Sequence, residues 1–172
     1  KSYTYDPVSY TYVFTLYHGI TFSGGSFLTS ADVKATLDRA RSSERYGARL
    51  SDVTGITAGS ETVTVTLAGP NTGFPALLDI PIVKDGTWER PVGTGPYLFS
   101  AEDSGDWLIA NQSWWRGAKQ PLDRIALVEA SDQDTLLYRF SSHDVQLMTA
   151  DLTGTTPISA TDNVTYLDAG TT

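Results

Sequence analysis

The sequence predicts an α/β fold with mixed sheets (α+β), and three features of the 172-residue chain point to it. Residues 10–17 alternate aromatic and β-branched side chains, a pattern that is typical of a strand. Residues 29–41 carry apolar side chains at helical spacing behind a capping signal. Residues 125–148 follow the order strand, helix, strand, so we expect a right-handed β-α-β unit with parallel strands there.

The first elements are a strand and a capped helix. The Ser-Gly-Gly-Ser run at residues 23–26 predicts a loop after the first strand. Thr29 stands three residues before Asp32, which is the spacing of a capping box, so the helix is expected to begin there. The apolar side chains that should face the core from this helix are Val33, Leu37 and Ala40.

Two β-hairpins are expected in the middle of the chain. Residues 53–58 and 62–67 alternate around a Gly-Ser turn and predict the first hairpin. Residues 74–78 predict a short helix, limited by the prolines at 75 and 81. Residues 97–101 and 107–110 predict the second hairpin, joined by an acidic loop.

The β-α-β unit is read from a buried strand over 125–128, a helix over 132–141 and a strand over 145–148. Asp132 and Asp134 stand where the helix begins, so they are expected to cap it rather than to bind a metal. The side chains expected to point inward from this helix are Leu136, Leu137 and Phe140.

Composition excludes several classes of function. The chain has 12 Lys and Arg against 20 Asp and Glu, a net charge of −8, which is the wrong sign for a nucleic-acid partner. The absence of cysteine removes disulfides, thiolate metal sites and cysteine nucleophiles. No sustained apolar run of membrane-spanning length is present, and the start lacks the pattern of a secretory signal peptide.

The charge is divided unevenly along the chain. Residues 1–86 hold 8 acidic and 7 basic side chains, whereas residues 87–172 hold 12 and 5. The change falls in a stretch rich in Pro and Gly around residues 84–96. We therefore expect a subdomain boundary near Trp88.

No residue pattern supports catalysis. The chain has no Gly-x-Ser-x-Gly elbow, and its two histidines are not placed for a triad. A carboxylate pair among Glu102, Asp103 and Asp106 would make an enzyme only if two of them shared a pocket, and a solvated turn is the expected alternative. Trp114 and Trp115 beside an arginine could form a platform for a sugar or base, or could pack internally.

Three segments of the chain resemble hallmarks of one family. They are the strand, loop and helix at residues 10–41, the Pro-Val-Gly-Thr-Gly-Pro-Tyr run at 91–97, and the Asn-Gln-Ser-Trp-Trp-Arg-Gly segment that leads from residue 111 to Leu-Asp-Arg-Ile at 122–125. Together they resemble the extracellular solute-binding proteins of oligopeptide, dipeptide and nickel ABC importers, family 5. The departures are local: Gly24, Gln112 and Gln146 replace the residues usual in the family.

The resemblance implies part of a periplasmic-binding-protein-like lobe of the class with an extra small subdomain. Residues 1–88 would be the small subdomain of lobe one, and residues 89–172 part of the main lobe, ending at the hinge. Family members are far longer, with an opening strand before this segment and a second lobe after it. The chain is therefore expected to be a fragment that lacks both.

The resemblance also implies a function without catalysis or cofactor. The protein would capture peptides or another small solute outside the cell and deliver them to ABC permease subunits, touching the membrane only through the permease or a lipid anchor. It would be periplasmic or anchored at the cell surface, with its signal peptide absent from this chain. A stand-alone surface domain that binds carbohydrate or mediates adhesion through Trp114 and Trp115 is the alternative, and it requires those rings to be exposed.

The solute-contacting residues are likewise carried over from the resemblance. Thr149, Ala150, Asp151 and Leu152 would form the loop that faces the cleft between the lobes. Tyr46, in the loop after the first helix, is a further candidate. No catalytic or metal-binding residue is expected.

Overall fold

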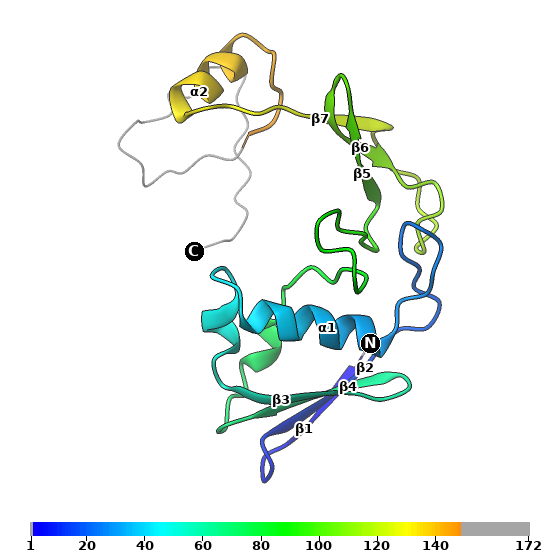
Figure 1. Ribbon diagram of the computed structural model, residues 1–172, viewed down its shortest axis with the longest axis vertical. Helices are drawn as coiled ribbons and strands as arrows, with labels where there is room; N and C mark the ends of the chain where they lie inside the picture. Colours follow the sequence, from blue (N-terminus) through cyan, green and yellow to red (C-terminus); the bar gives the residue numbers. More distant parts are fainter. Residues whose placement is uncertain (1, 149–172) are drawn as a thin grey trace. The chain divides into compact units, whose positions relative to one another are not determined.

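The computed structural model describes residues 2–148 of the chain. Two compact units make up the chain, Lys1–Ala126 and Leu127–Thr172, and the first contains most of the described elements (Figure 1). No helix in the described part is long and apolar enough to cross a membrane. The architecture is mixed α/β with antiparallel sheets, which confirms the predicted fold class.

A four-stranded antiparallel sheet forms the base of the first unit. Its strands are β1 (Ser2–Asp6), β2 (Thr11–Thr15), β3 (Val53–Ala58) and β4 (Thr62–Leu67), in the order β1-β2-β4-β3. The predicted hairpin of β3 and β4 is confirmed with the same bounds. β1 was not predicted, and it is a strand because its residues pair with β2 along their whole length.

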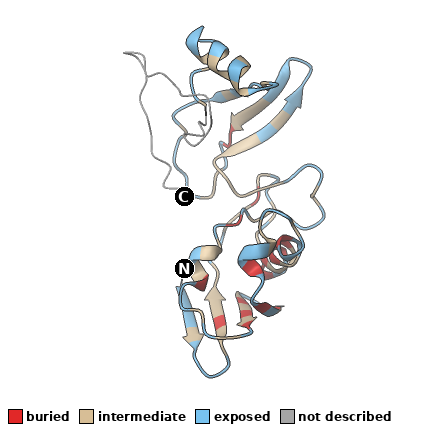
Figure 2. Cartoon of the chain, turned by 90° about the vertical axis from the view of Figure 1, so that its left-hand side faces the viewer, coloured by how far each residue is buried: buried red, intermediate tan, exposed pale blue. Residues whose placement is uncertain are grey.

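Helix α1 (Ser30–Arg41) covers one face of this sheet and begins where the capping signal predicts. The side chain of Thr29 accepts a hydrogen bond from the Asp32 N–H, and the Asp32 carboxylate accepts one from the Thr29 N–H, so both halves of the capping box are present. The predicted inward residues are buried: Val33, Leu37 and Ala40. Figure 2 shows buried residues on α1 and on the strands beneath it.

The core under α1 combines alternating strand residues with aromatic rings. Val63, Val65 and Leu67 point to the core from alternate positions of β4, as the period of a strand requires. Tyr12 of β2 is the largest side chain among them and is 1% exposed. Phe74, in the 3-10 helix η2 (Phe74–Leu77), packs against its ring at a centroid distance of 5.6 Å. The short helix expected over 74–78 is thus a single 3-10 turn.

A second, three-stranded sheet has the order β5-β6-β7. β5 (Tyr97–Glu102) and β6 (Gly105–Ala110) form the predicted hairpin, extended to a tighter turn than expected. β7 (Arg124–Leu127) lies where a buried strand was predicted, but Leu127 is 45% exposed and Val128 is 42% exposed. The prediction of burial is wrong because nothing in residues 2–148 covers these side chains.

Helix α2 (Gln133–Ser141) follows in the second unit. Asp132 caps it by accepting a hydrogen bond from the Thr135 N–H at 2.7 Å, as predicted. The three side chains expected to point inward are only half-buried, and no residue of the helix is fully buried. Residues 145–148 form no strand, so the predicted β-α-β unit is not present in the described part. A strand needs a neighbouring strand for its hydrogen bonds, and no residue of 2–148 pairs with this segment.

A buried carboxylate at the start of α1 ties the helix to residues 83–85. Asp32 accepts hydrogen bonds from the N–H of Thr29 and from the N–H of Asp85, at 2.9 and 3.1 Å. Burial by itself raises the pKa of Asp32, but these bonds, the Thr29 hydroxyl and the nearby Lys84 outweigh burial and hold the pKa below its usual range. The carboxylate therefore stabilises the fold in its charged form.

Replacing Asp32 by asparagine is expected to lower the free energy of unfolding at pH 7 by about 1 kcal/mol, because the amide keeps an acceptor oxygen but loses the charge that the N–H donors and Lys84 favour. A carboxyl whose pKa is depressed in the folded state stabilises above its unfolded pKa of about 3.9, and this stabilisation is lost as the pH falls through the folded pKa. The difference in the free energy of unfolding between wild type and Asp32→Asn should therefore shrink below about pH 4. Urea unfolding at pH 7 and pH 3 measures it, and a difference of the same size at both values would contradict the role of the charge.

Candidate functional site

The predicted solute-contacting loop, Thr149, Ala150, Asp151 and Leu152, lies outside the described residues. Tyr46 is described and stands directly before the 3-10 helix η1 (Gly47–Leu50). Its N–H donates to the Ser43 hydroxyl at 3.1 Å, which fixes the turn after α1. One side of the Tyr46 side chain packs against the core cluster, so the residue is half-buried.

Two arginines flank the Tyr46 ring. The guanidinium carbon of Arg45 lies 5.4 Å from the ring centroid, and that of Arg49 lies 5.7 Å from it. These distances allow cation–π attraction, which limits the positions that the two side chains take. Arg49 is also held by an ion pair with Asp79, whereas no carboxylate in residues 2–148 pairs with Arg45. We call Arg45, Tyr46 and Arg49 the arginine–tyrosine cluster.

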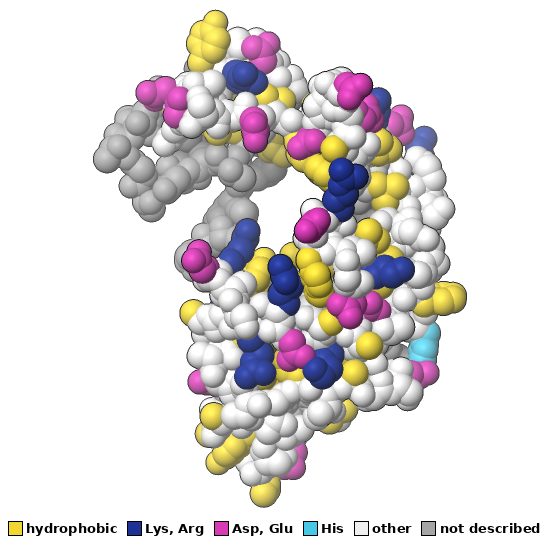
Figure 3. Space-filling model, in the orientation of Figure 1, with side chains coloured by type: hydrophobic (Ala, Val, Ile, Leu, Met, Phe, Trp, Pro, Cys, Tyr) yellow, Lys and Arg dark blue, Asp and Glu magenta, His cyan; other side chains and the backbone are white. Residues whose placement is uncertain are grey.

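The cluster belongs to a basic stretch in an otherwise acidic chain. Residues 34–49 contain five basic side chains and only Asp38 and Glu44 as acids. Figure 3 shows Lys and Arg side chains gathered around α1. Guanidinium groups present several N–H donors in a planar arrangement that matches a carboxylate. An exposed Arg45, beside a phenol and without an ion pair inside residues 2–148, is therefore suited to bind one. Sequence reasoning selected Tyr46 but missed the arginines, although the pattern Arg-Tyr-x-x-Arg is a readable signal.

The segments that carry the family resemblance meet around residues 92–96. Each of these five backbone carbonyls accepts a hydrogen bond. Ser23 N–H, from the loop after β2, donates to the Gly93 carbonyl at 3.0 Å. Asn111, which follows β6, donates its N–H to the Pro96 carbonyl at 2.8 Å. The glycine-rich run is thus a point of attachment between the two sheets of the first unit.

The paired tryptophans pack within this junction. The indole N–H groups of Trp114 and Trp115 both donate to the carbonyl of Thr94, at 3.0 and 3.1 Å. Both residues are half-buried, and their rings meet edge to face at a centroid distance of 6.2 Å. This arrangement matches the expectation of internal packing, and it does not meet the condition of exposed rings on which the carbohydrate-binding alternative depends.

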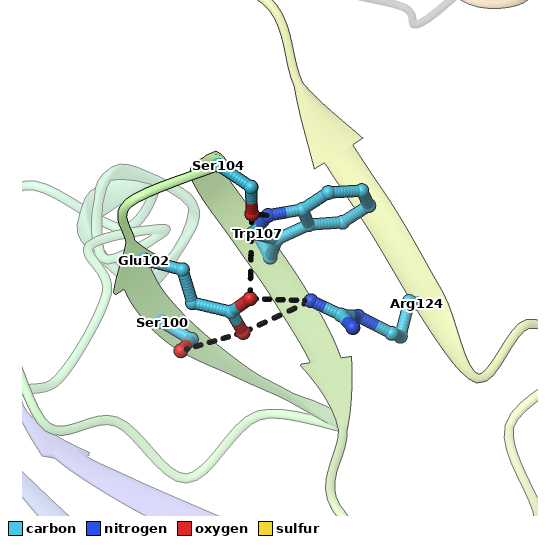
Figure 4. Close-up of polar contacts among 5 residues, drawn as sticks. All are labelled: Ser100, Glu102, Ser104, Trp107 and Arg124. Atoms are coloured by element: carbon cyan, nitrogen blue, oxygen red, sulfur yellow. Dashed lines mark hydrogen bonds and ion pairs between the residues drawn. The ribbon is translucent and has the colours of Figure 1, made fainter.

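The acidic hairpin turn does not form a catalytic pair. Arg124 of β7 donates to both carboxylate oxygens of Glu102 at 2.9 Å, and its guanidinium lies 4.3 Å from the Trp107 ring centroid (Figure 4). Asp103 and Asp106 are exposed to solvent. The arrangement is a solvated turn held by one ion pair. Within residues 2–148, no group of His, Asp and Glu side chains is arranged to hold a metal ion.

An apolar hollow of about 610 Å³ lies between the sheet and α1. Phe14 of β2, Leu16 just after it, Leu37 of α1 and Ile80 are among its lining residues. Tyr46, the predicted solute-contacting residue that falls within the described part, does not line it. It is therefore separate from the arginine–tyrosine cluster.

Comparison with known proteins gives a consistent result. The sequence profile described as bacterial extracellular solute-binding proteins, family 5 Middle, matches residues 1–171. The glutathione-binding protein GsiB of Salmonella typhimurium is 28% identical over 152 residues, which cover 78% of this chain and 30% of GsiB. GsiB of Escherichia coli K12 is also 28% identical over the same share of both chains.

Solved structures share the fold. NikA from Staphylococcus aureus in complex with Ni(L-His)2 superimposes with a TM-score of 0.68 at 25% identity, over 84% of this chain and 32% of NikA. The binding protein AgaA of A. tumefaciens R10, in complex with agropinic acid, gives a TM-score of 0.67 at 28% identity, over 84% of this chain and 33% of AgaA. The chain thus spans about a third of the length of the proteins it resembles, and its fold corresponds to part of one of their lobes.

Proposed function

Because the chain belongs to the bacterial extracellular solute-binding proteins of family 5, we propose that it forms part of the lobe with which such a protein captures a small carboxylate-bearing solute for an ABC importer. Its relatives are solute-binding proteins of this class rather than enzymes. The proposed role is capture outside the cytoplasmic membrane and delivery to the permease subunits. ATP hydrolysis belongs to the transporter in this account, and no step of catalysis is assigned to this chain.

The observation that carries the proposal is Arg45, which lies beside the Tyr46 ring and forms no ion pair with any carboxylate of the described residues. Carboxylates outnumber basic groups in this chain, and an exposed guanidinium gains modestly from one that lies nearby. Arg45 has none within residues 2–148, while the ring of Tyr46 restricts it on one side. A solute carboxylate would complete this half of the site.

The solutes named with the relatives support the same class. GsiB is named for glutathione, NikA was solved with Ni(L-His)2 and AgaA with agropinic acid, and all of these molecules carry carboxylate groups. Peptides also end in a carboxylate, so a short peptide such as glutathione fits the class. We propose that Tyr46 contributes to the solute site together with Thr149, Ala150, Asp151 and Leu152.

The proposed division of the lobe follows the charge distribution. Residues 1–88 would be the small subdomain and residues 89–172 part of the main lobe that ends at the hinge. Solute would bind between this lobe and a second one, and closure would favour the form that the permease accepts. An extracellular or periplasmic position, with or without a lipid anchor, is part of the same proposal.

Thermal unfolding with a panel of solutes tests the proposal. If a whole protein binds at about 1 μM, near −8 kcal/mol, and this lobe supplies half, the chain alone should bind at about 1 mM. At about 10 mM, glutathione should then stabilise the fold by about 1.4 kcal/mol and raise Tm by roughly 3–6 °C.

Glutathione dimethyl ester is the matched control, because it keeps the peptide and loses the carboxylate charges. It should raise Tm little. Maltose represents the carbohydrate-binding alternative. A rise with maltose or with the ester, and none with glutathione, would contradict the proposal.

A further inference from the structure

We infer that Trp114 and Trp115 are positioning residues, which lock residues 92–96 into a rigid strut and thereby fix the orientation of the α1 sheet relative to the β5–β6 hairpin. The inference rests on the proposed function only for its purpose, which is to hold the Tyr46 side of the solute site in place. The glycine-rich composition of the segment alone predicts a flexible linker. The hydrogen bonds indicate the opposite.

The strut is attached on the α1 side through residues 83–85. The Thr36 hydroxyl, on α1, donates to the Val83 carbonyl at 3.1 Å and accepts from the Val83 N–H at 3.2 Å. Lys84 N–H then donates to the Val92 carbonyl at 2.9 Å, next to the Ser23 bond to Gly93. The helix that precedes the arginine–tyrosine cluster is thus bonded to the beginning of the strut.

The attachment on the hairpin side comes from residues 111–115. Asn111 donates its side-chain amide to the Gly95 carbonyl at 3.3 Å and its N–H to the Pro96 carbonyl. Between these ends, the single carbonyl of Thr94 accepts both indole N–H groups, one for each oxygen lone pair. Every backbone carbonyl at positions 92–96 therefore accepts a hydrogen bond. Rotation of the segment would break several of these bonds at once.

The tryptophans are suited to this role by their size and by their single donor. Half-buried indole rings need a partner for the N–H and cover a large apolar area. Trp115 also lies 6.5 Å from the Tyr17 ring, between centroids, and Tyr17 belongs to the segment that follows β2. The indole pair therefore touches both sides of the strut. Phenylalanine at these positions would keep an aromatic ring while losing the N–H donor and part of the apolar area.

Residual dipolar couplings in a weakly aligned sample test the inference directly, because they report the relative orientation of two folded parts. In the wild-type chain, residues 2–82 and residues 97–126 should give one common alignment tensor. In the double variant Trp114→Phe, Trp115→Phe, the two parts should keep their own folds but give different tensors. Trp107→Phe is the matched control, since its N–H bonds only to the Ser104 hydroxyl at 3.2 Å; it should keep the common tensor.

Two different tensors in the wild type, or a common tensor in the folded double variant, would overturn the inference. If the double variant does not fold, hydrogen exchange of the tryptophan indole N–H groups in the wild-type chain tests the inference instead. Both indole N–H groups should then exchange at least about tenfold more slowly than that of Trp107, and exchange as fast as Trp107 would refute the lock. No solute is present in these measurements, so they test only the rigidity of residues 92–96. The proposed function is tested separately, by thermal unfolding with the panel of solutes.

Discussion

Replacing Tyr12 by alanine is expected to remove about 3–5 kcal/mol from the free energy of unfolding, the range measured for large aromatic residues in cores. The residue is 1% exposed, and its ring contacts those of Tyr5, Phe14 and Phe74 at centroid distances of 4.5, 5.8 and 5.6 Å. Its hydroxyl also donates to the Asn71 carbonyl at 2.8 Å. Since a domain is stable by about 5–15 kcal/mol in total, the loss should remove between about a fifth and all of the free energy of unfolding.

Tyr12→Phe separates the ring from the hydroxyl. It keeps the aromatic packing and leaves only the Asn71 carbonyl without its partner, so a loss of about 1 kcal/mol is expected. Urea unfolding followed by circular dichroism measures both variants. A Tyr12→Ala chain within about 1 kcal/mol of wild type would contradict the position of the core under α1.

Arg45→Glu is expected to abolish detectable binding of glutathione to the chain. A hydrogen bond to a charged group contributes about 1.5–3 kcal/mol, so removing it costs roughly 10-fold to 100-fold in affinity, and the new carboxylate adds repulsion. From a starting affinity of about 1 mM, the remaining binding would lie beyond the range of titration calorimetry.

Lys119→Glu is the control for this substitution. Lys119 is exposed on the connection between β6 and β7, and its reversal changes the net charge by the same amount. Its affinity for glutathione should stay within about twofold of wild type, because exposed charges far from a ligand act weakly in salt. Equal losses in both variants would show that net charge, rather than the arginine–tyrosine cluster, determines binding.

Elements with strong local signals could be predicted from the sequence. The capping box of α1 and the β3–β4 hairpin depend on residues a few positions apart, and both were predicted with their starting residues. β1 was missed because its five residues become a strand only through their register with β2, such as Tyr3 opposite Phe14. The prediction of a strand at 145–148 was wrong because an apolar run becomes a strand only where a neighbouring strand pairs with it.

The candidate site could be predicted only in part. Tyr46 was selected from the resemblance, and the spacing of Arg45 and Arg49 around it was available in the sequence but not used. The role of the Thr94 carbonyl as acceptor for both indole N–H groups could not be predicted, because every residue has a backbone carbonyl whatever its side chain. The tryptophans that use it were identified as residues of interest, with packing as one of two expected roles.

An amide NMR titration of the chain with glutathione tests the central claim most directly, because it shows both whether a carboxylate-bearing solute binds and where. The account predicts shifts of the amide signals of residues 44–50 that saturate with a Kd of about 1 mM, near −4 kcal/mol, and smaller shifts with the dimethyl ester. Signals at residues 44–50 that do not move up to about 20 mM glutathione would contradict it, since a site of that affinity would then be almost fully occupied.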